Sequence, residues 1–414
     1  MDMPFISGEG SKEAFAVVSL RPSRGASGYL RKKLDEAIEA GFRVFKIRLN
    51  NGRGLYPNQV LPIVATLAHY SDEYGCRFIA SRTTAKGTYA GNIGLLNPYR
   101  NPDSVASTAF LDKVWLFNCD THFDIVSGIV TSLREAAVLA PGLLQGIEYG
   151  LNEISDNVLV HSSICDEDRA AGYVMAQVHH QSNKVAISVF DSGVGIPVSL
   201  KRGGVLFQDP RDAIGLALNR GVTDGSGAGN GLWLLDRIVS AAAGSLDIQS
   251  DGVGYRKVHA ESTDNGIVSF RKVGTPVPGS TLVDFQVSLD AEISMQDIFE
   301  GDTPVDLWRE ERELDGLGIN LRLNLKKEAG GFGSRFDGAK MRNLALNMAN
   351  SAEGYVVLDF SGVPFISLSF ADEFVGKLLK TVGLATFVSK FCVLNLCEAC
   401  ADAIDYVTRQ GGTA

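Results

Sequence analysis

The chain has 414 residues, of which 45% are hydrophobic and 21% are charged, a balance typical of folded globular domains rather than of disordered chains. This length accommodates two or three domains of ordinary size, each able to bury its own core. The net charge of -9 argues against a chain-wide surface for nucleic acid or for an acidic membrane, because phosphate binding needs clustered Lys and Arg.

Targeting and redox features point to the cytoplasm. No uninterrupted apolar segment reaches the length of a membrane span, and Met1–Lys12 lacks the basic start and apolar middle of a signal peptide. The six cysteines are scattered without a disulfide framework, so we expect them to be reduced. Cys397 and Cys400 form a lone CxxC without a second pair or a nearby His, so a zinc ion would lack two ligands. We therefore expect a helix whose thiols are packed in the protein, and not a zinc site.

The N-terminal third alternates strands with helices and predicts a small α/β unit. The stretch Arg43–Ala80 resembles, at a distance, a STAS domain, the fold of anti-sigma-factor antagonists. Thr84–Ser107 is rich in Gly, Asn, Thr and Pro and predicts a loop. The predicted elements, in chain order, are strand Phe15–Leu20, helix Gly28–Ala40, strand Val44–Leu49, helix Asn58–Tyr74, strand Cys76–Ala80, strand Val114–Asn118 and helix Phe123–Ala140.

The stretch Leu144–Ser163 organises the middle of the chain. Its apolar residues recur every three or four positions, which predicts an amphipathic helix with one buried stripe. The same period aligns Glu153, Asn157 and His161, one turn apart, on a second stripe. Because Asn is a poor choice for a helix interior, its place one turn after a Glu indicates a functional role.

Two later stretches complete the pattern. A β-rich run, Lys184–Phe190, leads into the DSGVGIP segment Asp191–Pro197, and GAGNGL at Gly227–Leu232 precedes the helical run Trp233–Ala243. A helix with ExxxN, a strand with DxGxG and a GxGxGL that opens a helix resemble the ATP-binding domain of the GHKL family. Histidine kinases, anti-sigma-factor serine kinases, DNA gyrase, Hsp90 and MutL share that domain.

The GHKL resemblance covers Leu144 to about Leu289 and implies a mixed sheet with helices on one face. The irregular lid segment Pro197–Ser226 contains four cations that could contact phosphate, although charged residues in such segments are usually solvated. They are Lys201, Arg202, Arg211 and Arg220. The other strands expected here are Gly172–His180, Ser245–Gln249, Gly266–Phe270 and Thr281–Leu289.

The resemblance assigns roles to the helix ladder. Asn157 would bind Mg²⁺ through its amide oxygen together with the phosphates of ATP, since Mg²⁺ prefers oxygen ligands and keeps several waters. Glu153 matches the residue that polarises the attacking water in hydrolytic members. His161 aligns with a basic or aromatic position near the phosphates in the kinase members; the alternative is an interaction with the helix C-terminus alone.

The two glycine segments would hold the nucleotide. Asp191 offers a carboxylate, which accepts hydrogen bonds only, to the exocyclic amine of adenine. Gly193 and Gly195 would let the base lie against backbone, although Asp-x-Gly is by itself a common turn. The phosphate-binding set would be Gly227, Gly229, Gly231 and Leu232, because free N–H groups at a helix start attract phosphate.

The C-terminal region predicts a linker followed by a third α/β unit. Asp290–Asp315 is acidic and contains Gly and Pro, which suggests a linker with a short helix around Leu307–Glu313. LDFSGVPFISLSFADEF, Leu358–Phe374, resembles the STAS-like domains found beside GHKL ATPases. Leu368 occupies the position of the phosphorylatable serine of STAS antagonists. The flanking Ser367 and Ser369 are expected to be N-caps of a helix and not phosphate acceptors.

The expected fold class is therefore α/β (α+β), a GHKL-type mixed sheet flanked by two smaller α/β units. The expected segments are an N-terminal α/β domain at 1–125, a GHKL ATP-binding domain at 126–290, an acidic linker at 291–316 and a STAS-like domain at 317–414. The strands and helices expected in the last are Leu321–Leu325, Gly338–Asn350, Tyr355–Phe360, Phe370–Val382, Phe391–Leu396 and Glu398–Thr408.

Several functions fit this organisation. The first is an Mg²⁺-dependent ATPase that acts as a nucleotide-driven switch for protein interactions, with Glu153 as the catalytic residue. The alternatives are a serine/threonine protein kinase of the anti-sigma-factor type and an ATP sensor that does not hydrolyse. A sensor histidine kinase is disfavoured because neither His69 nor His122 has the acidic neighbour of a phosphoacceptor His. We expect ATP and a protein partner, leave a homodimer open, and expect neither nucleic acid nor membrane.

Overall fold

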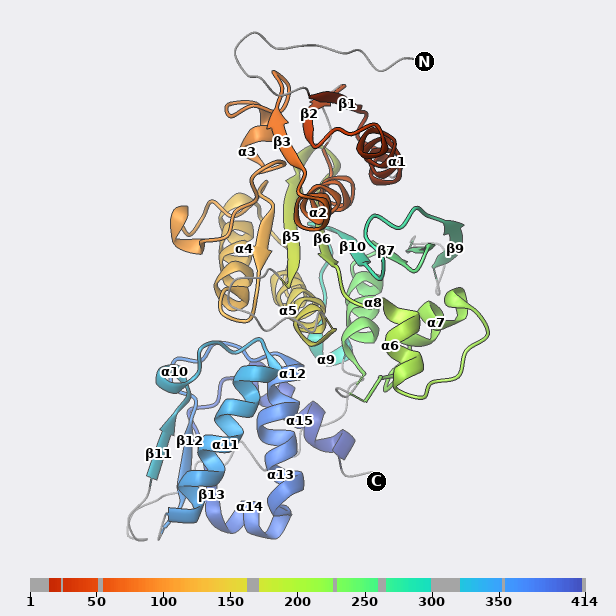
Figure 1. Cartoon of the computed structure of the whole chain (residues 1–414). Coiled ribbons are helices and arrows are strands. Elements are labelled where there is room, and N and C mark those ends of the chain that lie inside the picture. Colours follow the sequence, from red (N-terminus) through yellow and green to blue (C-terminus); the bar gives the residue numbers. More distant parts are fainter. Residues whose placement is uncertain are drawn as a thin grey trace.

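The computed structural model describes residues 15–23, 25–50, 55–161, 171–225, 229–259, 266–298, 321–351 and 354–411. In this part of the chain the strands form three sheets (Figure 1), one of seven strands between two of three strands. We refer to residues 15–113 as the N-terminal unit, 114–298 as the central unit and 321–411 as the C-terminal unit.

The N-terminal unit is a parallel three-stranded sheet, β1-β2-β3, whose crossovers are helical. Helix α2 begins with Pro57, whose missing N–H costs nothing in a first turn, and is capped at its C-terminus by Gly75 with φ +63°. The predicted loop contains two short helical turns, α3 and a 3₁₀ turn. The elements are β1 Ala16–Leu20, α1 Ala26–Glu39, β2 Val44–Leu49, α2 Pro57–Tyr74, β3 Arg77–Ala80, α3 Tyr89–Asn92 and a 3₁₀ turn Pro102–Ser104.

The central unit is a seven-stranded sheet of order β4-β5-β6-β10-β7-β8-β9. Each of these neighbouring pairs is antiparallel, whereas the sequence led us to expect a mixed sheet. Strand β4 belongs to this sheet although it falls inside the predicted segment 1–125. The strands are β4 Trp115–Phe117, β5 Gly172–His179, β6 Lys184–Asp191, β7 Ser245–Ser250, β8 Val253–Val258, β9 Ile267–Lys272 and β10 Thr281–Ser288.

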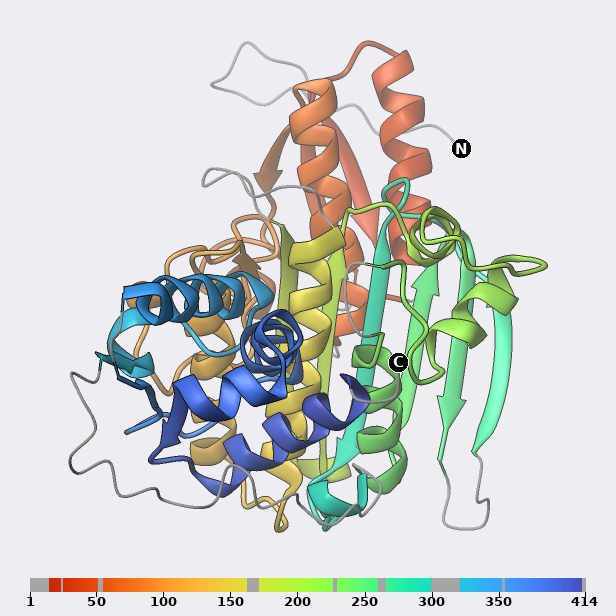
Figure 2. The same cartoon turned by 90° about the horizontal axis from the view of Figure 1, so that it is seen from below.

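Different parts of the chain cover the two faces of this sheet. Helices α4, α5 and α8 lie together on one face, as predicted, and α2 of the N-terminal unit contacts β5, β6 and β10 on the other (Figures 1 and 2). The buried Asn58 of α2 donates to Asp284 of β10 at 3.0 Å. These helices are α4 His122–Ala136, α5 Leu143–His161 and α8 Gly231–Ala241, with the short α9 Met295–Ile298 after the last strand.

Regular structure also occurs where the sequence had suggested none. The lid contains α6, Ile196–Arg202, and α7, Pro210–Ala217. Asp209 caps α7 by accepting from the N–H groups of Arg211 and Asp212. The pair Asp209-Pro210 is a helix-start signal that was present in the sequence. Strand β8 follows an Asp251-Gly252 turn in which both residues have positive φ, the turn that closes tight hairpins.

The C-terminal unit is a parallel sheet, β11-β12-β13, with helices that face the central unit (Figure 2). Ser367 caps α12 by accepting from the N–H of Phe370, as predicted. Helix α14 was not expected, and the predicted helix Leu307–Glu313 lies outside the described residues. The elements are β11 Leu321–Asn324, α10 Leu325–Glu328, α11 Arg335–Ser351, β12 Val356–Asp359, α12 Leu368–Ala371, a π turn Asp372–Gly376, α13 Lys377–Val382, α14 Leu384–Lys390, β13 Phe391–Leu394 and α15 Glu398–Gly411.

One hydrophobic core continues from α5 and α8 of the central unit into the C-terminal unit. Trp233 of α8 stacks on Tyr406 of α15 with ring centroids 6.2 Å apart, and Tyr149 of α5 meets Phe365 edge-on at 4.6 Å. The Tyr149 hydroxyl also donates to the carbonyl of Ala399 at 3.1 Å. The C-terminal unit is therefore packed against the helix that carries the Glu153, Asn157 and His161 ladder.

Two further expectations concern cysteines and membranes. Cys397 immediately precedes α15 and Cys400 lies in its first turn; their thiols are 3.3 Å from the carbonyl oxygen of Pro364 and 3.8 Å from that of Val363, respectively, and neither forms a disulfide. The described residues contain no cluster of three or more potential metal ligands of the His, Cys, Asp or Glu type. Among the helices described, none combines the length and the apolar character needed to cross a membrane.

Candidate nucleotide site

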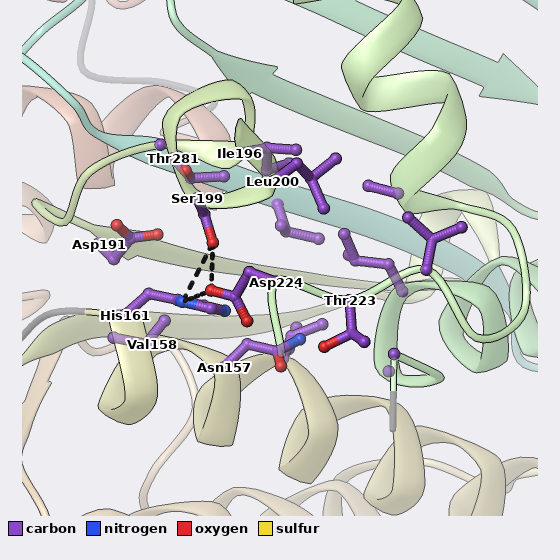
Figure 3. A pocket seen from close by; sticks show the side chains of 18 of the residues that line it. Asn157, Val158, His161, Asp191, Ile196, Ser199, Leu200, Thr223, Asp224 and Thr281 are labelled. Atoms are coloured by element: carbon purple, nitrogen blue, oxygen red, sulfur yellow. Dashed lines mark hydrogen bonds and ion pairs between the residues drawn. The ribbon is translucent and has the colours of Figure 1, made fainter. Parts of the chain in front are cut away.

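A cleft of about 910 Å³, including its open mouth, lies between α5, the end of β6, the lid helix α6 and the start of α8 (Figure 3). The lining is mostly apolar with a few polar groups. Its polar members are Asn157, His161, Asp191, Ser199, Thr223, Asp224, Asn230, Thr281 and Arg335.

Helix α5 contributes two of its three ladder residues to the cleft wall. Asn157 lies beside the first residue of α8, and His161 lies one turn further on. The Nδ1 atom of His161 is 3.3 Å from Oδ2 of Asp224, to which the Ser199 hydroxyl donates at 2.6 Å. Burial lowers the pKa of His161 against the opposing effect of Asp224. This end of α5 is thus tied to the lid.

Asp191, at the end of β6, is buried and faces the cleft (Figure 3). Its Oδ1 atom accepts a hydrogen bond from the N–H of Gly193 at 2.7 Å, and its strand partner is Thr281. Burial raises the pKa of Asp191 to about 7, although hydrogen bonds from Gly193 and Thr281 oppose the shift. The site therefore holds a buried carboxyl group that can accept a hydrogen bond from a polar ligand when ionised and can donate one when protonated.

Two glycines after Asp191, Gly193 and Gly195, leave their positions in the turn without a side chain. Gly195 has φ +80°, a conformation that disfavours other residues, and the N–H of Ile196 that follows donates to the Ser250 hydroxyl at 3.0 Å. A Cβ on Gly193 would lie 2.7 Å from Asp191 Oδ1. Gly195 lines the cleft, whereas Gly193 supports it through its bond to Asp191.

The second glycine segment brings the start of α8 against α5. Gly229 has φ +71°, and a Cβ there would lie 2.5 Å from the carbonyl oxygen of Val222. A Cβ on Gly231 would lie 3.0 Å from Asn157 Nδ2 and 3.3 Å from Glu153 Oε2. Gly229, Gly231 and Leu232 all line the cleft, while Gly227 lies outside the described residues. The helix start therefore approaches Asn157 closely because position 231 has no side chain.

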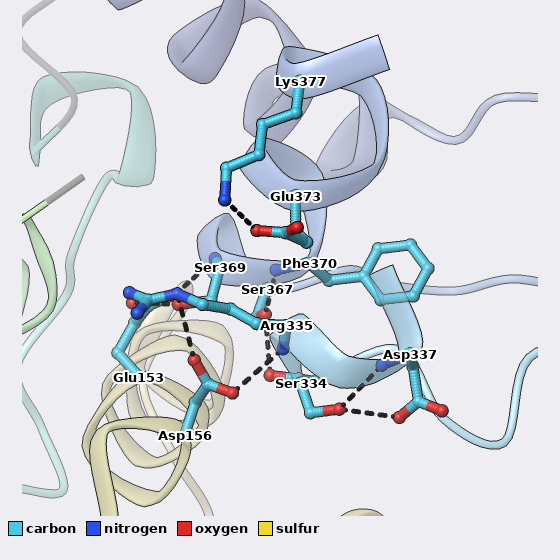
Figure 4. A network of polar contacts seen from close by, with 11 residues as sticks. Glu153, Asp156, Ser334, Arg335, Asp337, Ser367, Ser369, Phe370, Glu373 and Lys377 are labelled. Atoms are coloured by element: carbon cyan, nitrogen blue, oxygen red, sulfur yellow. Dashed lines mark hydrogen bonds and ion pairs between the residues drawn. The ribbon is translucent and has the colours of Figure 1, made fainter. Parts of the chain in front are cut away.

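Glu153, the residue expected to activate water, is bound to the C-terminal unit (Figure 4). Its Oε1 accepts the N–H of Ser369 at 3.0 Å, and its Oε2 accepts the Ser369 hydroxyl at 3.0 Å. Burial, followed by the nearby Asp156, raises the pKa of Glu153 to about 7. Ser369 thus binds Glu153 where the sequence had favoured an N-cap.

Arg335, the first residue of α11, is a site residue that the sequence did not reveal. Its backbone N–H donates to Oδ1 of the buried Asp156 at 3.0 Å, and its Nε lies 3.5 Å from Oδ2 of the same carboxylate. Figure 4 shows its side chain beside Glu153 and Asp156, and Arg335 is one of the residues that line the cleft. No sequence signal links positions 179 residues apart.

The four lid cations named from the sequence do not line the cleft. Lys201, Arg202 and Arg211 are exposed, as solvated charges are, and Arg220 stacks over Trp233 and Tyr406. The lid instead contributes Ser199, Thr223 and Asp224. Sequence reasoning missed these three because small polar residues in a Gly-rich segment carry no periodic signal.

The sheet, the face of helices and the glycine turns at one cleft define a GHKL-type ATP-binding domain, and the chain joins it to a C-terminal STAS-like domain. Residues 144–275 match the family model of histidine kinase-, DNA gyrase B- and HSP90-like ATPases. Residues 337–399 match a STAS-like domain of unknown function. A search of curated proteins finds no match to the sequence.

Solved structures with detectable similarity include three topoisomerase fragments. The Francisella tularensis topoisomerase IV ATP-binding domain, in complex with a small-molecule inhibitor, is 15% identical over 39% of this chain and 40% of that one, with a TM-score of 0.22. The Thermus thermophilus gyrase B 43K ATPase domain, in complex with an aminocoumarin, is 16% identical over 39% of this chain and 35% of that one, with a TM-score of 0.21. The ATPase region of Saccharomyces cerevisiae topoisomerase II is 15% identical over 34% of this chain and 36% of that one, with a TM-score of 0.19. The chain thus covers less than half of each.

Proposed function

We propose that this protein is an Mg²⁺-dependent ATPase that works as a nucleotide-driven conformational switch for protein interactions. The observation that carries the proposal is Glu153. It stands on the helix that forms one wall of the nucleotide cleft, and it is also hydrogen-bonded to Ser369 of the STAS-like domain. A change at the cleft is thereby transmitted directly to the docked domain.

The residues present fit a nucleotide. Asp191 would accept from the exocyclic amine of adenine beside Thr281, and the free N–H groups at the start of α8, next to Gly231, would bind phosphates. The amide oxygen of Asn157 would hold Mg²⁺, and a bound Mg²⁺ neutralises charge on the phosphates. The missing side chain at position 231 supports this assignment, since a Cβ there would press against Asn157.

Hydrolysis would use Glu153 as a general base, and a carboxyl group whose pKa is about 7 is suited to that role at neutral pH. In the docked arrangement both oxygens of this carboxylate accept from Ser369. Glu153 is buried and is not among the described residues that line the cleft, so a water would reach its carboxylate only after the contact with Ser369 opened. Turnover would thus require the STAS-like domain to shift on α5, which couples hydrolysis to the switch.

The test is incubation of the full chain with labelled ATP and Mg²⁺, followed by separation of products. Free phosphate is expected from the wild type. Asp191→Ala should abolish nucleotide binding, and Glu153→Ala should retain binding in calorimetry but release no phosphate. Equal turnover in the Glu153 variant would remove the general-base role, and wild-type affinity in the Asp191 variant would remove that residue from the adenine site.

A second candidate is phosphotransfer to serine, and the contact at 3.0 Å between the Ser369 hydroxyl and Glu153 favours it. Ser369 Oγ would attack the γ-phosphorus of ATP and pass its proton to Glu153 as the bond to the β-phosphate oxygen breaks and ADP leaves. Phosphate on Ser369 in mass spectra of the incubated protein, lost in Ser369→Ala, would select this candidate. Unchanged ATP in the same incubation would indicate a sensor that binds without turnover.

The partner of the switch is proposed to be another protein, or a second copy of this chain, in the cytoplasm. The acidic net charge of -9 supports a protein rather than a nucleic acid. Size-exclusion chromatography coupled to light scattering, with and without ATP, would distinguish a nucleotide-dependent homodimer from a chain that stays monomeric until another protein binds.

A further inference from the structure

The two cysteines at the start of α15 direct their thiols at one loop of the C-terminal unit. Cys397 is the N-cap of the helix, because its carbonyl oxygen accepts the N–H of Ala401 at 2.9 Å. Its Sγ atom lies 3.3 Å from the carbonyl oxygen of Pro364 and 3.5 Å from that of Val363. The Sγ atom of Cys400 lies 3.8 Å from the same Val363 oxygen. The two thiols therefore lie side by side and share a hydrogen-bond acceptor.

The two thiols differ in their access to solvent. Cys400 is 0% exposed, whereas Cys397 is partly exposed. Burial raises the pKa of the Cys400 thiol, and both the charge of Cys397 and a hydrogen bond with its thiol raise this pKa further. Cys397 is thus the thiol that a dissolved reagent can reach, and Cys400 lies behind it, in contact with it.

This arrangement suits a disulfide better than a metal. Side chains three residues apart on a helix have Cβ atoms about 5–6 Å apart, so a shift of about 1–2 Å in the first turn brings them to disulfide distance. A helix start also favours the negative charge of a thiolate, which is the reactive form of cysteine. Zinc would need further ligands, and the described residues contain no cluster of three or more His, Cys, Asp or Glu side chains.

The pair lies at the contact between the STAS-like domain and α5. The carbonyl oxygen of Ala399, between the two cysteines, accepts the Tyr149 hydroxyl at 3.1 Å. Phe365, which follows the loop carbonyls that the thiols approach, meets the Tyr149 ring edge-on at 4.6 Å. Tyr149 stands one turn before Glu153 on α5. A movement of the first turn of α15 therefore reaches the helix that forms a wall of the cleft.

We propose that Cys397 and Cys400 are a redox pair whose reversible disulfide weakens the contact of the STAS-like domain with α5. The oxidant is a low-molecular-weight disulfide. The thiolate of Cys397 attacks one of its sulfurs and the other half leaves as a thiolate. The thiolate of Cys400 then attacks Cys397 Sγ and releases the second half. The cysteines lose two electrons and two protons, and the external disulfide becomes two thiols.

Oxidation changes the contacts at the start of α15. The bridge removes the thiol hydrogens that the carbonyls of Val363 and Pro364 accept, and it draws the first turn together around Ala399. We therefore expect the hydrogen bond from Tyr149 to weaken. In a reducing compartment, such as the cytoplasm proposed for this protein, disulfides are transient and serve redox sensing. The inference goes beyond the proposed ATPase and needs no bound nucleotide.

The test is incubation of the full chain with oxidised glutathione, followed by alkylation and mass spectrometry of the peptide that contains both cysteines. The wild-type peptide should become lighter by two hydrogens and escape alkylation, and reduced glutathione should restore both thiols. Cys400→Ser should stop at a mixed disulfide with one glutathione on Cys397. Cys119→Ser is the matched control, because this partly exposed thiol belongs to the central unit, and its bridge should form as in the wild type.

Hydrogen exchange measures the effect on α5. Amides of residues 146–153 should exchange about 3- to 10-fold faster in the oxidised than in the reduced wild type, the effect of one lost hydrogen bond. Tyr149→Phe lacks the hydroxyl, so the difference between its two redox states should shrink.

Two results in the wild type alone would overturn the inference, so it does not depend on how the variants fold. If both thiols stay free in excess oxidised glutathione, or only a mixed disulfide forms, the cysteines are not a redox pair. If the bridge forms and residues 146–153 exchange equally in both states, it does not act on α5. The proposed ATPase stands in either case, because neither measurement includes a nucleotide.

Discussion

Glu153→Gln tests how burial and docking set the charge state of the carboxyl group that the ATPase proposal depends on. Gln has the same shape, and its amide can accept from the Ser369 N–H and donate to the Ser369 hydroxyl, so both contacts at 3.0 Å can persist. The substitution therefore removes the titration and leaves the packing. Glu398→Gln, at an exposed position that begins α15, is the surface control.

The magnitude follows from the pKa of Glu153, which burial raises from the ordinary 4.5 to about 7. The folded protein binds more protons than the unfolded chain between these values, so the contribution of Glu153 is full below the lower value. It is lost as pH rises through the upper one. Between pH 5 and pH 8 the wild type should lose about 2–3 kcal/mol more unfolding free energy than Glu153→Gln.

The assay is urea unfolding of both proteins at pH 5 and pH 8, followed by tryptophan fluorescence, to which Trp233 at the interface of the two domains contributes. The quantity compared is the difference between the two pH values in each protein. Glu398→Gln should behave as the wild type. If wild type and Glu153→Gln respond equally to pH, Glu153 is ionised in the folded protein over the whole range, and the argument from burial is wrong.

Two further substitutions probe positions where the structure leaves little room. Gly231→Ala should weaken ATP binding about tenfold, equal to about 1.4 kcal/mol, because its Cβ would press on Asn157 Nδ2 at 3.0 Å; calorimetry measures it. Gly215→Ala, in α7 with nothing within 4 Å, is the control, and equal affinities in the two variants would contradict the steric argument. Asn58→Ala should cost about 1–3 kcal/mol of stability in urea unfolding, because buried Asp284 loses a donor; an unchanged midpoint would refute it.

Local patterns in the sequence were sufficient for most of the fold. The apolar period of Leu144–Ser163 predicted α5, and alternating strands and helices predicted the small α/β units at both ends. The order ExxxN, DxGxG, GxGxGL led to the ATP-binding domain, which the family model over residues 144–275 confirms. These features are legible because periodicity, capping and glycine turns depend on residues close together in the chain.

Other features were missed or wrong for identifiable reasons. The antiparallel pairing of the central sheet depends on which distant strands meet, and no local pattern encodes that. Helices α6 and α7 were missed although Asp209 before Pro210 marked one of the two starts. The hairpin that ends in β8 was missed although Asp251-Gly252 marked its turn. In these last cases the local signal was present and outweighed by the high glycine content around it.

The composition of the site divides along the same line. The sequence by itself determined that one helix presents Glu153 and Asn157 a turn apart, since helical period is a property of neighbouring residues. Only the tertiary structure decided that Ser369 binds Glu153 and that Arg335 enters the cleft. Those partners lie some 180 to 216 residues away along the chain, and they are brought together by the packing of two domains on a common core rather than by any local preference.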